Sequence, residues 1–241
     1  YLIVADDVWS LDAWDGIRSV LPDDGNRSRV LLTTRDENLA TFAASSGPIL
    51  RLKPMDEKPS WLLFEKKIFG EDGRCPPQLV NIGKKIAEGC HGLPIAIVII
   101  AGILSNIRRS PESWEVIAED VNGALSGGDE PFMEILSLSY YHLPAHLKHC
   151  FLYFGGFPED YVIHVTNLIR LWVGEGFLKA AKNKTAEEIG YSCVEDLVKR
   201  NLVMVTKKRY TGEIKRCKVH DLMREICIRK AKEEKFLHLV N

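Results

Sequence analysis

The chain has 241 residues, of which 46% are hydrophobic and 27% charged, and 32 basic side chains nearly balance 33 acidic ones. This composition excludes a disordered chain, a collagen-like repeat and a protein that coats nucleic acid along its whole length. Residues 1–130 carry 14 basic and 20 acidic side chains, whereas residues 131–241 carry 18 and 13. The two parts therefore have opposite net charge, which favours at least two units with different partners.

The first 55 residues have the pattern of alternating strands and helices. Apolar or β-branched runs predict strands at 1–5, 29–33 and 49–52, and the segments between them predict helices at 11–20 and 36–44. Strands buried on both faces and joined by helices are typical of a parallel α/β sheet. Because Tyr1 opens directly into an apolar run, we interpret the sequence as a truncated fragment of a larger protein.

Residues 56–130 have the pattern of a small helical unit. Asp56 can cap a first helix, Gly70 can end it, and Ser110-Pro111-Glu112 combines a capping hydroxyl with proline at the first helical position. The run 93–104 is the most apolar stretch, yet it is well short of the ~20 residues that a membrane-spanning helix needs. We expect a buried helix there, no transmembrane segment, and a linker at 122–131.

Residues 131–241 have the outline of a winged helix. Helices are predicted at 132–141, 145–153, 165–175, 185–200 and 221–233. The fourth begins with the capping box Thr185-x-x-Glu188. The runs 202–206 and 213–219 flank the turn Tyr210-Thr211-Gly212 and predict a basic β-hairpin. The predicted fold class is thus a partial parallel α/β sheet, then a helical and a winged-helix subdomain, mostly helical overall, with boundaries at 1–55, 56–130 and 131–241.

The six cysteines are widely spaced, without a Cys-x-x-Cys pair. This usage favours reduced, mostly buried thiols and a cytoplasmic protein, with nuclear or membrane-associated states left open.

Polar side chains follow the first two predicted strands. Asp6 and Asp7 end the first strand in a Walker B arrangement, in which one carboxylate can hold Mg²⁺ and its neighbour can orient or deprotonate a water. The alternative is that both residues only end a strand and cap a helix. The second strand ends at Thr33-Thr34-Arg35, and the planar donor fork of arginine matches phosphate oxygens. Because ligands bind at the carboxyl ends of parallel strands, we favour a nucleotide site.

Six groups of motifs lead to a family resemblance. In chain order they are Asp6-Asp7-Val8-Trp9, Leu32-Thr33-Thr34-Arg35, Gly92-Leu93-Pro94-Ile95, Cys150-Phe151-Leu152-Tyr153-Phe154 with Phe157-Pro158-Glu159-Asp160, Leu171-Trp172 with Glu175-Gly176-Phe177, and Val219-His220-Asp221. The chain closely resembles the NB-ARC module of plant coiled-coil-type nucleotide-binding leucine-rich-repeat (NLR) immune receptors. The resemblance covers essentially all 241 residues.

The resemblance implies roles for individual residues in the α/β part. Asp6 resembles the Walker B acid associated with Mg²⁺, and Asp7 resembles the family's catalytic acid. Arg35 is similar to the sensor arginine that reads the terminal phosphate, and Thr34 precedes it in the same motif.

Further roles follow from the resemblance in the two helical parts. Leu93 and Pro94 fall in the motif whose proline packs near the adenine and ribose. His220 resembles the histidine that touches the β-phosphate of ADP and holds the winged helix against the nucleotide, and Asp221 is expected to fix the local geometry. Three aromatic residues of these motifs are expected to act in packing only: Trp9, Trp172 and Phe177.

The sequence departs from the family pattern in three places. Ile95 and Val219 are conservative replacements of a leucine and a methionine. The third departure is larger, since the phosphate-loop string Gly-x-x-x-x-Gly-Lys-Ser/Thr does not occur in the 241 residues. In the family this loop precedes the Walker B strand. We therefore expect the fragment alone to be inactive, and the complete protein to be at most a slow ATPase.

The resemblance implies a molecular switch controlled by ADP and ATP. In such a switch, exchange of ADP for ATP frees the winged helix, and the complete receptor controls defence and hypersensitive cell death. Expected cofactors are ADP or ATP and Mg²⁺. Expected partners are the coiled-coil and leucine-rich-repeat regions within the same receptor, and further copies of it in an active oligomer.

Three other interpretations remain. The winged helix could bind DNA through six basic residues, Lys207, Lys208, Arg209, Lys215, Arg216 and Lys218; nucleic acid is the less favoured partner because DNA binding leaves His220 unexplained. A metabolic ATPase is a second alternative. A metal site at His142, His146, His149 and Cys150 is the third, and the interruption by Pro144 disfavours it.

Overall fold

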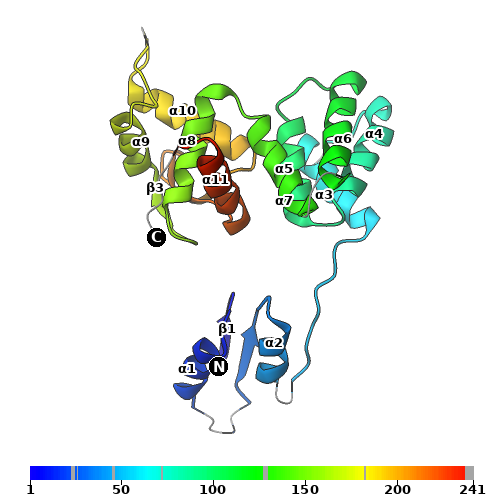
Figure 1. Ribbon diagram of the computed structural model, residues 1–241, viewed down its shortest axis with the longest axis vertical. Coiled ribbons are helices and arrows are strands. Elements are labelled where there is room, and N and C mark those ends of the chain that lie inside the picture. Colours follow the sequence, from blue (N-terminus) through cyan, green and yellow to red (C-terminus); the bar gives the residue numbers. More distant parts are fainter. Residues whose placement is uncertain are drawn as a thin grey trace. The chain divides into compact units, whose positions relative to one another are not determined.

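The computed structural model describes residues 1–22, 25, 27–44, 47–71, 73–126, 130–181 and 183–236. Its contacts divide the chain into two units, Tyr1–Lys53 and Pro54–Asn241. Helices predominate, and the strands form one two-stranded and one three-stranded sheet (Figure 1). Within the described residues, no helix has the length and apolar character required to cross a bilayer.

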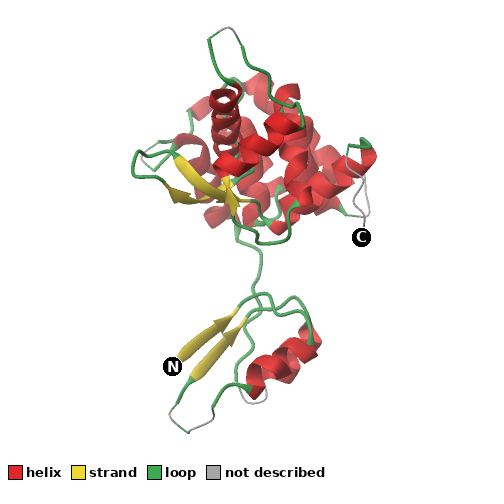
Figure 2. Ribbon diagram, turned by 90° about the vertical axis from the view of Figure 1, so that its left-hand side faces the viewer, coloured by secondary structure: helices red, strands yellow, loops and turns green. Residues whose placement is uncertain are grey.

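The unit Tyr1–Lys53 is a short α/β segment. Its elements are β1 (Leu2–Ala5), α1 (Leu11–Ser19), β2 (Arg29–Leu32) and α2 (Glu37–Ala44). The strands pair in parallel, with Leu2 beside Arg29 and Ala5 beside Leu32, and Figure 2 shows both arrows pointing the same way. Alternate side chains of the strands contact a small core formed by Val8, Trp14 and Leu39. The predicted parallel pairing is therefore confirmed.

Two predictions for this unit were wrong. Residues 49–52 form no strand, since no described neighbour pairs with them and Leu50 and Leu52 are 83% and 89% exposed. An isolated extended segment cannot build a ladder of hydrogen bonds. Trp9 does not pack, because it follows a turn at Asp7 and its side chain is 79% exposed.

The helices after residue 54 first form an all-helical layer. Its members are α3 (Glu57–Phe69), α4 (Pro77–Gly89), α5 (Pro94–Leu104) and α6 (Pro111–Ser126). They bury one apolar cluster, in which Phe64, Ile97 and Trp114 are fully covered. The predicted linker at 122–131 was partly wrong, because α6 continues to Ser126 and α7 begins at Pro131; residues 127–129 lie outside the described part. The predicted domain boundary at 130 stays a prediction.

The rest of this unit contains the winged-helix elements. They are α7 (Pro131–Tyr141), α8 (Ala145–Leu152), η1 (Tyr153–Gly156), β3 (Ile163–His164), α9 (Val165–Gly174), α10 (Ala186–Lys199), β4 (Met204–Lys208), β5 (Ile214–Lys218) and α11 (Asp221–Glu233). The capping box at Thr185 and the β4–β5 hairpin are confirmed. The sequence prediction missed β3, a two-residue strand that pairs antiparallel with β5. All six cysteines are free and buried, as expected.

Helix α5 joins the helical layer to the winged-helix elements. Its side chains divide between two cores, since Ile97 and Ile100 belong to one cluster and Ile99 to the other. At Gly102 the helix approaches the end of α10 so closely that an added Cβ would lie 2.1 Å from the carbonyl oxygen of Arg200. Next to it, the Asn201 side-chain amide donates to the Val98 carbonyl (3.0 Å).

Substitution of Gly102 tests this close approach. Gly102→Ala should lower the free energy of unfolding by about 1–3 kcal/mol, because a backbone carbonyl cannot move aside as a flexible side chain can. Gly123→Ala is the matched control, since Gly123 is exposed in helix α6 with nothing within 4 Å of an added Cβ, and it should be neutral or stabilising by up to about 1 kcal/mol. Urea unfolding followed by circular dichroism measures both; equal effects would contradict the close approach.

Candidate functional site

The first group of site residues lies where β1 and β2 end. Because the parallel register places Ala5 beside Leu32, the next residues, Asp6 and Thr33, are also neighbours. The Thr33 hydroxyl donates to Oδ1 of Asp6 and accepts from the backbone N–H of Asp7 (2.9 Å). The strands thus bring both aspartates and Thr33 into one polar group.

Arg35 completes this strand-end group by binding Asp7. Its guanidinium donates from Nε and Nη2 to Oδ1 (3.3 and 3.2 Å), and from Nη2 to Oδ2 (3.1 Å). The two side chains are 74% and 43% exposed, so water screens the pair and its net stabilisation is small. Asp7 has a left-handed backbone (φ 51°), a conformation that aspartate tolerates better than most residues. This turn positions the carboxylate toward Arg35.

Thr34 makes a local backbone contact in this structure. Its hydroxyl accepts from the Asp36 backbone N–H (3.0 Å) and so shapes the start of α2. Thr33, which the sequence prediction did not select, contacts the aspartates instead. The strand alternation and register could have identified it, since adjacent residues of a strand point to opposite faces. The assignment of Thr34 to nucleotide binding stays a prediction.

The strand-end group fits a hard divalent cation in its chemistry. Mg²⁺ prefers oxygen ligands and is usually held by one or two carboxylates together with water and substrate phosphates. Asp6 supplies such oxygens, and Thr33 orients its carboxylate through Oδ1. Among the described residues, no group of three acidic, histidine or cysteine side chains forms a complete metal site. Asp6 as metal ligand therefore stays a prediction.

A second group lies at the turn between α4 and α5. Gly92 has φ 67°, and an added Cβ would lie 2.2 Å from the Met55 carbonyl oxygen. The Gly92 carbonyl accepts from the Met55 backbone N–H (2.8 Å), which ties this turn to the segment before α3. Position 92 therefore requires glycine, because any other side chain would collide with the Met55 backbone and would strain the left-handed conformation. Pro94 then occupies the first position of α5 with its ring exposed.

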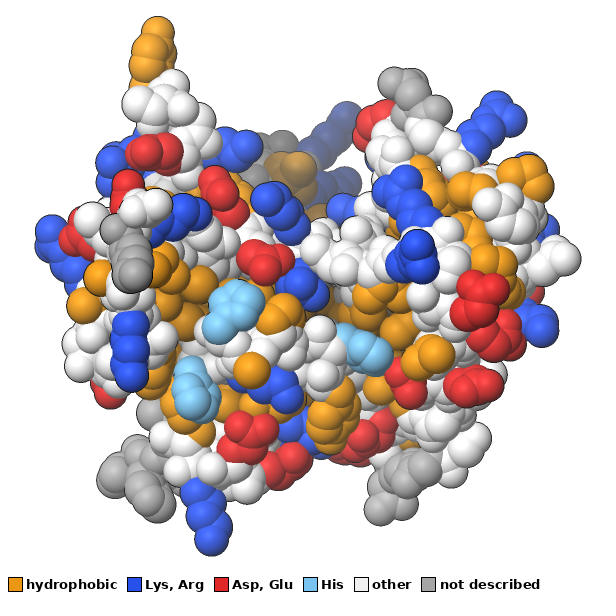
Figure 3. All heavy atoms as spheres, turned by 90° about the horizontal axis from the view of Figure 1, so that it is seen from above, with side chains coloured by type: hydrophobic (Ala, Val, Ile, Leu, Met, Phe, Trp, Pro, Cys, Tyr) orange, Lys and Arg blue, Asp and Glu red, His pale blue; other side chains and the backbone are white. Residues whose placement is uncertain are grey.

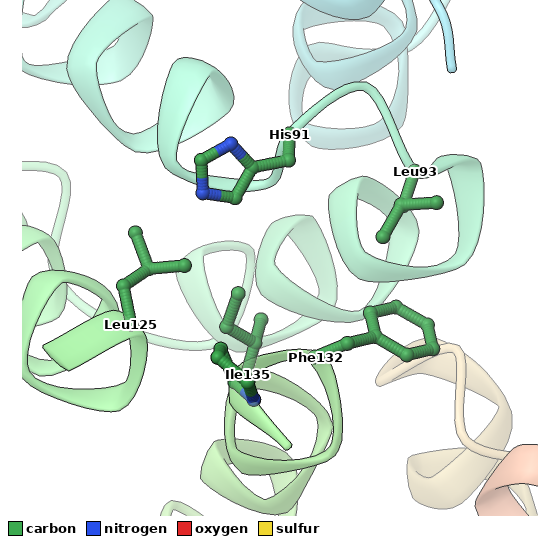
Figure 4. A pocket seen from close by; sticks show the side chains of 6 residues that line it. His91, Leu93, Leu125, Phe132 and Ile135 are labelled. Atoms are coloured by element: carbon green, nitrogen blue, oxygen red, sulfur yellow. The ribbon is translucent and has the colours of Figure 1, made fainter. Parts of the chain in front are cut away.

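An apolar pocket of about 330 Å³ opens beside this turn (Figure 4). His91 and Leu93 reach it from the turn, and Leu125, Phe132 and Ile135 reach it from α6 and α7. Leu93 thus lines an apolar cavity, whereas Pro94 is not one of the residues that line it. Such a lining suits an apolar group better than a charged one.

The third group is the start of α11. His220 is the N-cap residue, and its Nδ1 accepts from the Leu222 backbone N–H (3.2 Å). An acceptor nitrogen carries no proton, so the neutral ring has its proton on Nε2, where it can be donated outward. His220 is exposed, and Asp221 follows it in the first helical turn, where a carboxylate is favourable.

The basic hairpin has fewer available cations than its sequence suggests. Arg209 pairs with Glu213 (3.5 Å), and Lys218 pairs with Asp160 (2.6 Å). Helix α10, which precedes the hairpin, exposes three acidic side chains, Glu187, Glu188 and Glu195. On the face that Figure 3 shows, side chains of both signs are interspersed instead of forming one basic field. DNA phosphates would be repelled by α10.

The three histidines near α8 have separate surroundings. His142 contacts Asp120 through Nε2 (2.9 Å), while His149 stacks on Phe236 with ring centroids 4.9 Å apart. His146 is exposed on α8. The structure thus gives no support for the alternative of a histidine metal site.

Comparison with known proteins identifies the family. Residues 1–73 match the model of the NB-ARC domain, and residues 157–227 match the model of the disease resistance protein winged helix domain. The whole chain is 45% identical to a putative late blight resistance protein homolog and 44% identical to a late blight resistance protein, both from Solanum demissum. It spans 18% of the length of each. The chain therefore belongs to the NB-ARC family of plant disease-resistance proteins.

Proposed function

We propose that the chain is part of a nucleotide-dependent switch, controlled by ADP and ATP, in a plant immune receptor that triggers defence and hypersensitive cell death. The observation that supports this most strongly is the strand-end group of Asp6, Asp7, Thr33 and Arg35. Two carboxylates and an arginine converge at the carboxyl edge of a parallel pair, which is where α/β sheets bind ligands. The resistance proteins that match the whole chain support the receptor role.

The Asp7–Arg35 pair gives the switch a means of reading a terminal phosphate. The guanidinium is held by exposed, screened contacts, so a phosphate group can compete with the carboxylate for the same donors. When Arg35 turns to a phosphate, Asp7 is released to accept a proton from water. Mg²⁺, when bound beside Asp6, would neutralise phosphate charge.

His220 gives the switch a contact that depends on the nucleotide. Its Nε2–H is available for a phosphate oxygen while Nδ1 caps α11. ADP that binds this donor would stabilise the arrangement in which α11 and the winged helix meet the nucleotide. A nucleotide shifts such an equilibrium only by its difference in affinity for the two states.

The complete receptor, in this proposal, also contains a phosphate-binding loop, a coiled coil and leucine-rich repeats. The chain covers 18% of its relatives' length, which leaves room for these regions. We propose contacts with them, oligomerisation of the active form, and a cytoplasmic location. The exposed glutamates of α10 argue against duplex DNA as the main partner of the winged helix.

Substitutions of His220 separate its two hydrogen bonds. His220→Ser keeps an N-cap acceptor but removes the Nε2 donor, so the free energy of unfolding should change by less than about 1 kcal/mol. In the complete receptor, ADP should dissociate about 10- to 100-fold faster, because a hydrogen bond to a charged group is lost. Radiolabelled ADP retention and urea unfolding measure the two effects.

His220→Ala is the companion variant because it removes both the donor and the cap. It should lose ADP as fast as His220→Ser and also lose about 1 kcal/mol of stability. Wild-type ADP retention in a folded His220→Ser receptor would contradict the proposed role of Nε2.

Substitution of Arg35 tests recognition of the terminal phosphate. Arg35→Gln should weaken ATP binding to the complete receptor about tenfold or more, because charged hydrogen bonds to the γ-phosphate are lost, and should leave ADP affinity nearly unchanged. Arg51→Gln is the matched control, since the Arg51 side chain is 69% exposed, close to the 74% of Arg35, and pairs with Glu37 outside the strand-end group. Calorimetric titration with each nucleotide gives the affinities, and an equal loss for ATP and ADP would refute a sensor role.

A further inference from the structure

Residues 157–160, Phe157-Pro158-Glu159-Asp160, form a segment whose role the switch described above leaves unexplained. The segment follows η1 and precedes β3. We call it the FPED segment. Its residues contact the chain on both sides of His220, two residues before it at Lys218 and four residues after it at Arg224.

The contact before His220 is an ion pair. Lys218 Nζ donates to Asp160 Oδ1 at 2.6 Å, and the Lys218 side chain is only 32% exposed. The hydrogen bond and charge of Lys218 lower the pKa of the Asp160 carboxyl, so this carboxylate stays ionised at neutral pH. Asp160 has a left-handed backbone (φ 55°), which places its side chain in the turn before β3. The pair fixes the last residue of β5.

The contact after His220 is made in the first turns of α11. Arg224 Nε donates to the Phe157 backbone carbonyl (2.5 Å), and its Nη1 lies 3.8 Å from Glu159 Oε1. The Arg224 side chain is 24% exposed, so water screens these contacts less than it screens a free surface pair. The start of α11 is therefore tied to the same segment as the end of β5.

The FPED segment is itself anchored by aromatic contacts. Phe157 stacks on Tyr161, with ring centroids 5.8 Å apart and an interplanar angle of 13°, and it meets Tyr153 edge-on at 6.1 Å. The short helix η1, which precedes the segment, packs closely on α11. At Gly155 of η1, an added Cβ would lie only 3.2 Å from Ile228 of α11. The segment can thus hold Lys218 and Arg224 against a fixed base.

We propose that the FPED segment is a clamp that positions the His220 ring for the phosphate of a nucleoside diphosphate, with Asp160 and Arg224 as its positioning residues. This inference rests on the proposed function, because the clamp acts only through the Nε2–H of His220, the group proposed to bind the nucleotide. His220 is exposed, and within the described part of the chain its ring makes one hydrogen bond, to the Leu222 N–H. Fixing the backbone on both sides reduces the freedom that ligand binding would otherwise have to remove.

A purely structural clamp would stabilise the fold without affecting the nucleotide. The two roles can be told apart by measurement. A clamp that positions the His220 ring changes the rate of ADP dissociation and leaves the free energy of unfolding unchanged. The charge of the Asp160–Lys218 pair can also be reversed, which keeps the attraction and changes both side chains. If the reversed pair restores ADP retention, the attraction between positions 160 and 218 is what matters, and the identity of each side chain is not.

The experiment measures ADP dissociation from the complete receptor for wild type, Asp160→Asn and the double variant Asp160→Lys/Lys218→Asp. Asp160→Asn should release ADP about two- to fivefold faster, the range that one exposed ion pair supports, and the reversed pair should recover at least half of the loss. Glu71→Gln is the control, because the Lys66–Glu71 pair has a similar distance (2.7 Å) and its carboxylate is about as exposed as that of Asp160. It should leave the dissociation rate unchanged.

A second measurement uses the 241-residue chain without nucleotide. Asp160→Asn and Arg224→Met should shift and broaden the ring signals of His220 in nuclear magnetic resonance spectra, whereas Glu71→Gln should not. Arg224→Met keeps the apolar stem and removes the donors, so it also serves if Asp160→Asn folds poorly.

The outcomes separate the clamp from the proposed function. Fast ADP release by His220→Ser together with wild-type release by Asp160→Asn and unchanged ring signals would overturn the clamp alone. Wild-type release by His220→Ser would overturn the proposed role of the histidine, and the clamp with it. Faster release caused equally by Glu71→Gln would show a general effect of surface charge and would also overturn the clamp.

Discussion

The burial of α5 is the constraint on which the unit Pro54–Asn241 depends. This helix is apolar on all sides, and its residues divide between the two large cores. Such a helix must be covered completely, so the helical layer and the winged-helix elements have to pack on opposite sides of it. Its first turn carries Pro94, and its middle touches the end of α10 at Gly102. One helix thus links the turn at Gly92 to the winged-helix elements.

Local sequence signals predicted most of this fold. The capping box at Thr185 and the extent of α11 follow from side chains within a few residues of each element, and both are confirmed. The prediction failed where partners are distant in sequence. Strand β3 has only two residues and forms because it pairs with the edge of β5. Residues 49–52 have the composition of a strand but have no described neighbour to pair with. Pairing of strands is decided by tertiary structure, which single-sequence patterns do not contain.

For the candidate site as well, the sequence predicted which residues matter but not the contacts that depend on tertiary structure. The motifs located Asp6, Asp7 and Arg35, but the mutual binding of Asp7 and Arg35 across 28 positions required the strand register. The N-cap use of His220 Nδ1 was equally hidden, because serine, threonine, aspartate and asparagine are the residues expected there. The basic hairpin was overestimated, since the sequence shows Arg209 and Lys218 but not their carboxylate partners.

Stability and the proposed switching rest on different atoms in this chain. The buried clusters contain almost only apolar side chains, and close packing leaves them little freedom to rearrange. The proposed nucleotide contacts are exposed and weakly held: a screened ion pair at Arg35 and a donor nitrogen at His220. In the proposed switch, Arg35 would exchange its carboxylate partner for a phosphate and His220 would gain a phosphate partner, and neither step would open a core. In the proposed switch, a nucleotide would therefore act on the position of whole subdomains, and Asp160 and Arg224 would hold the chain on both sides of His220 in place.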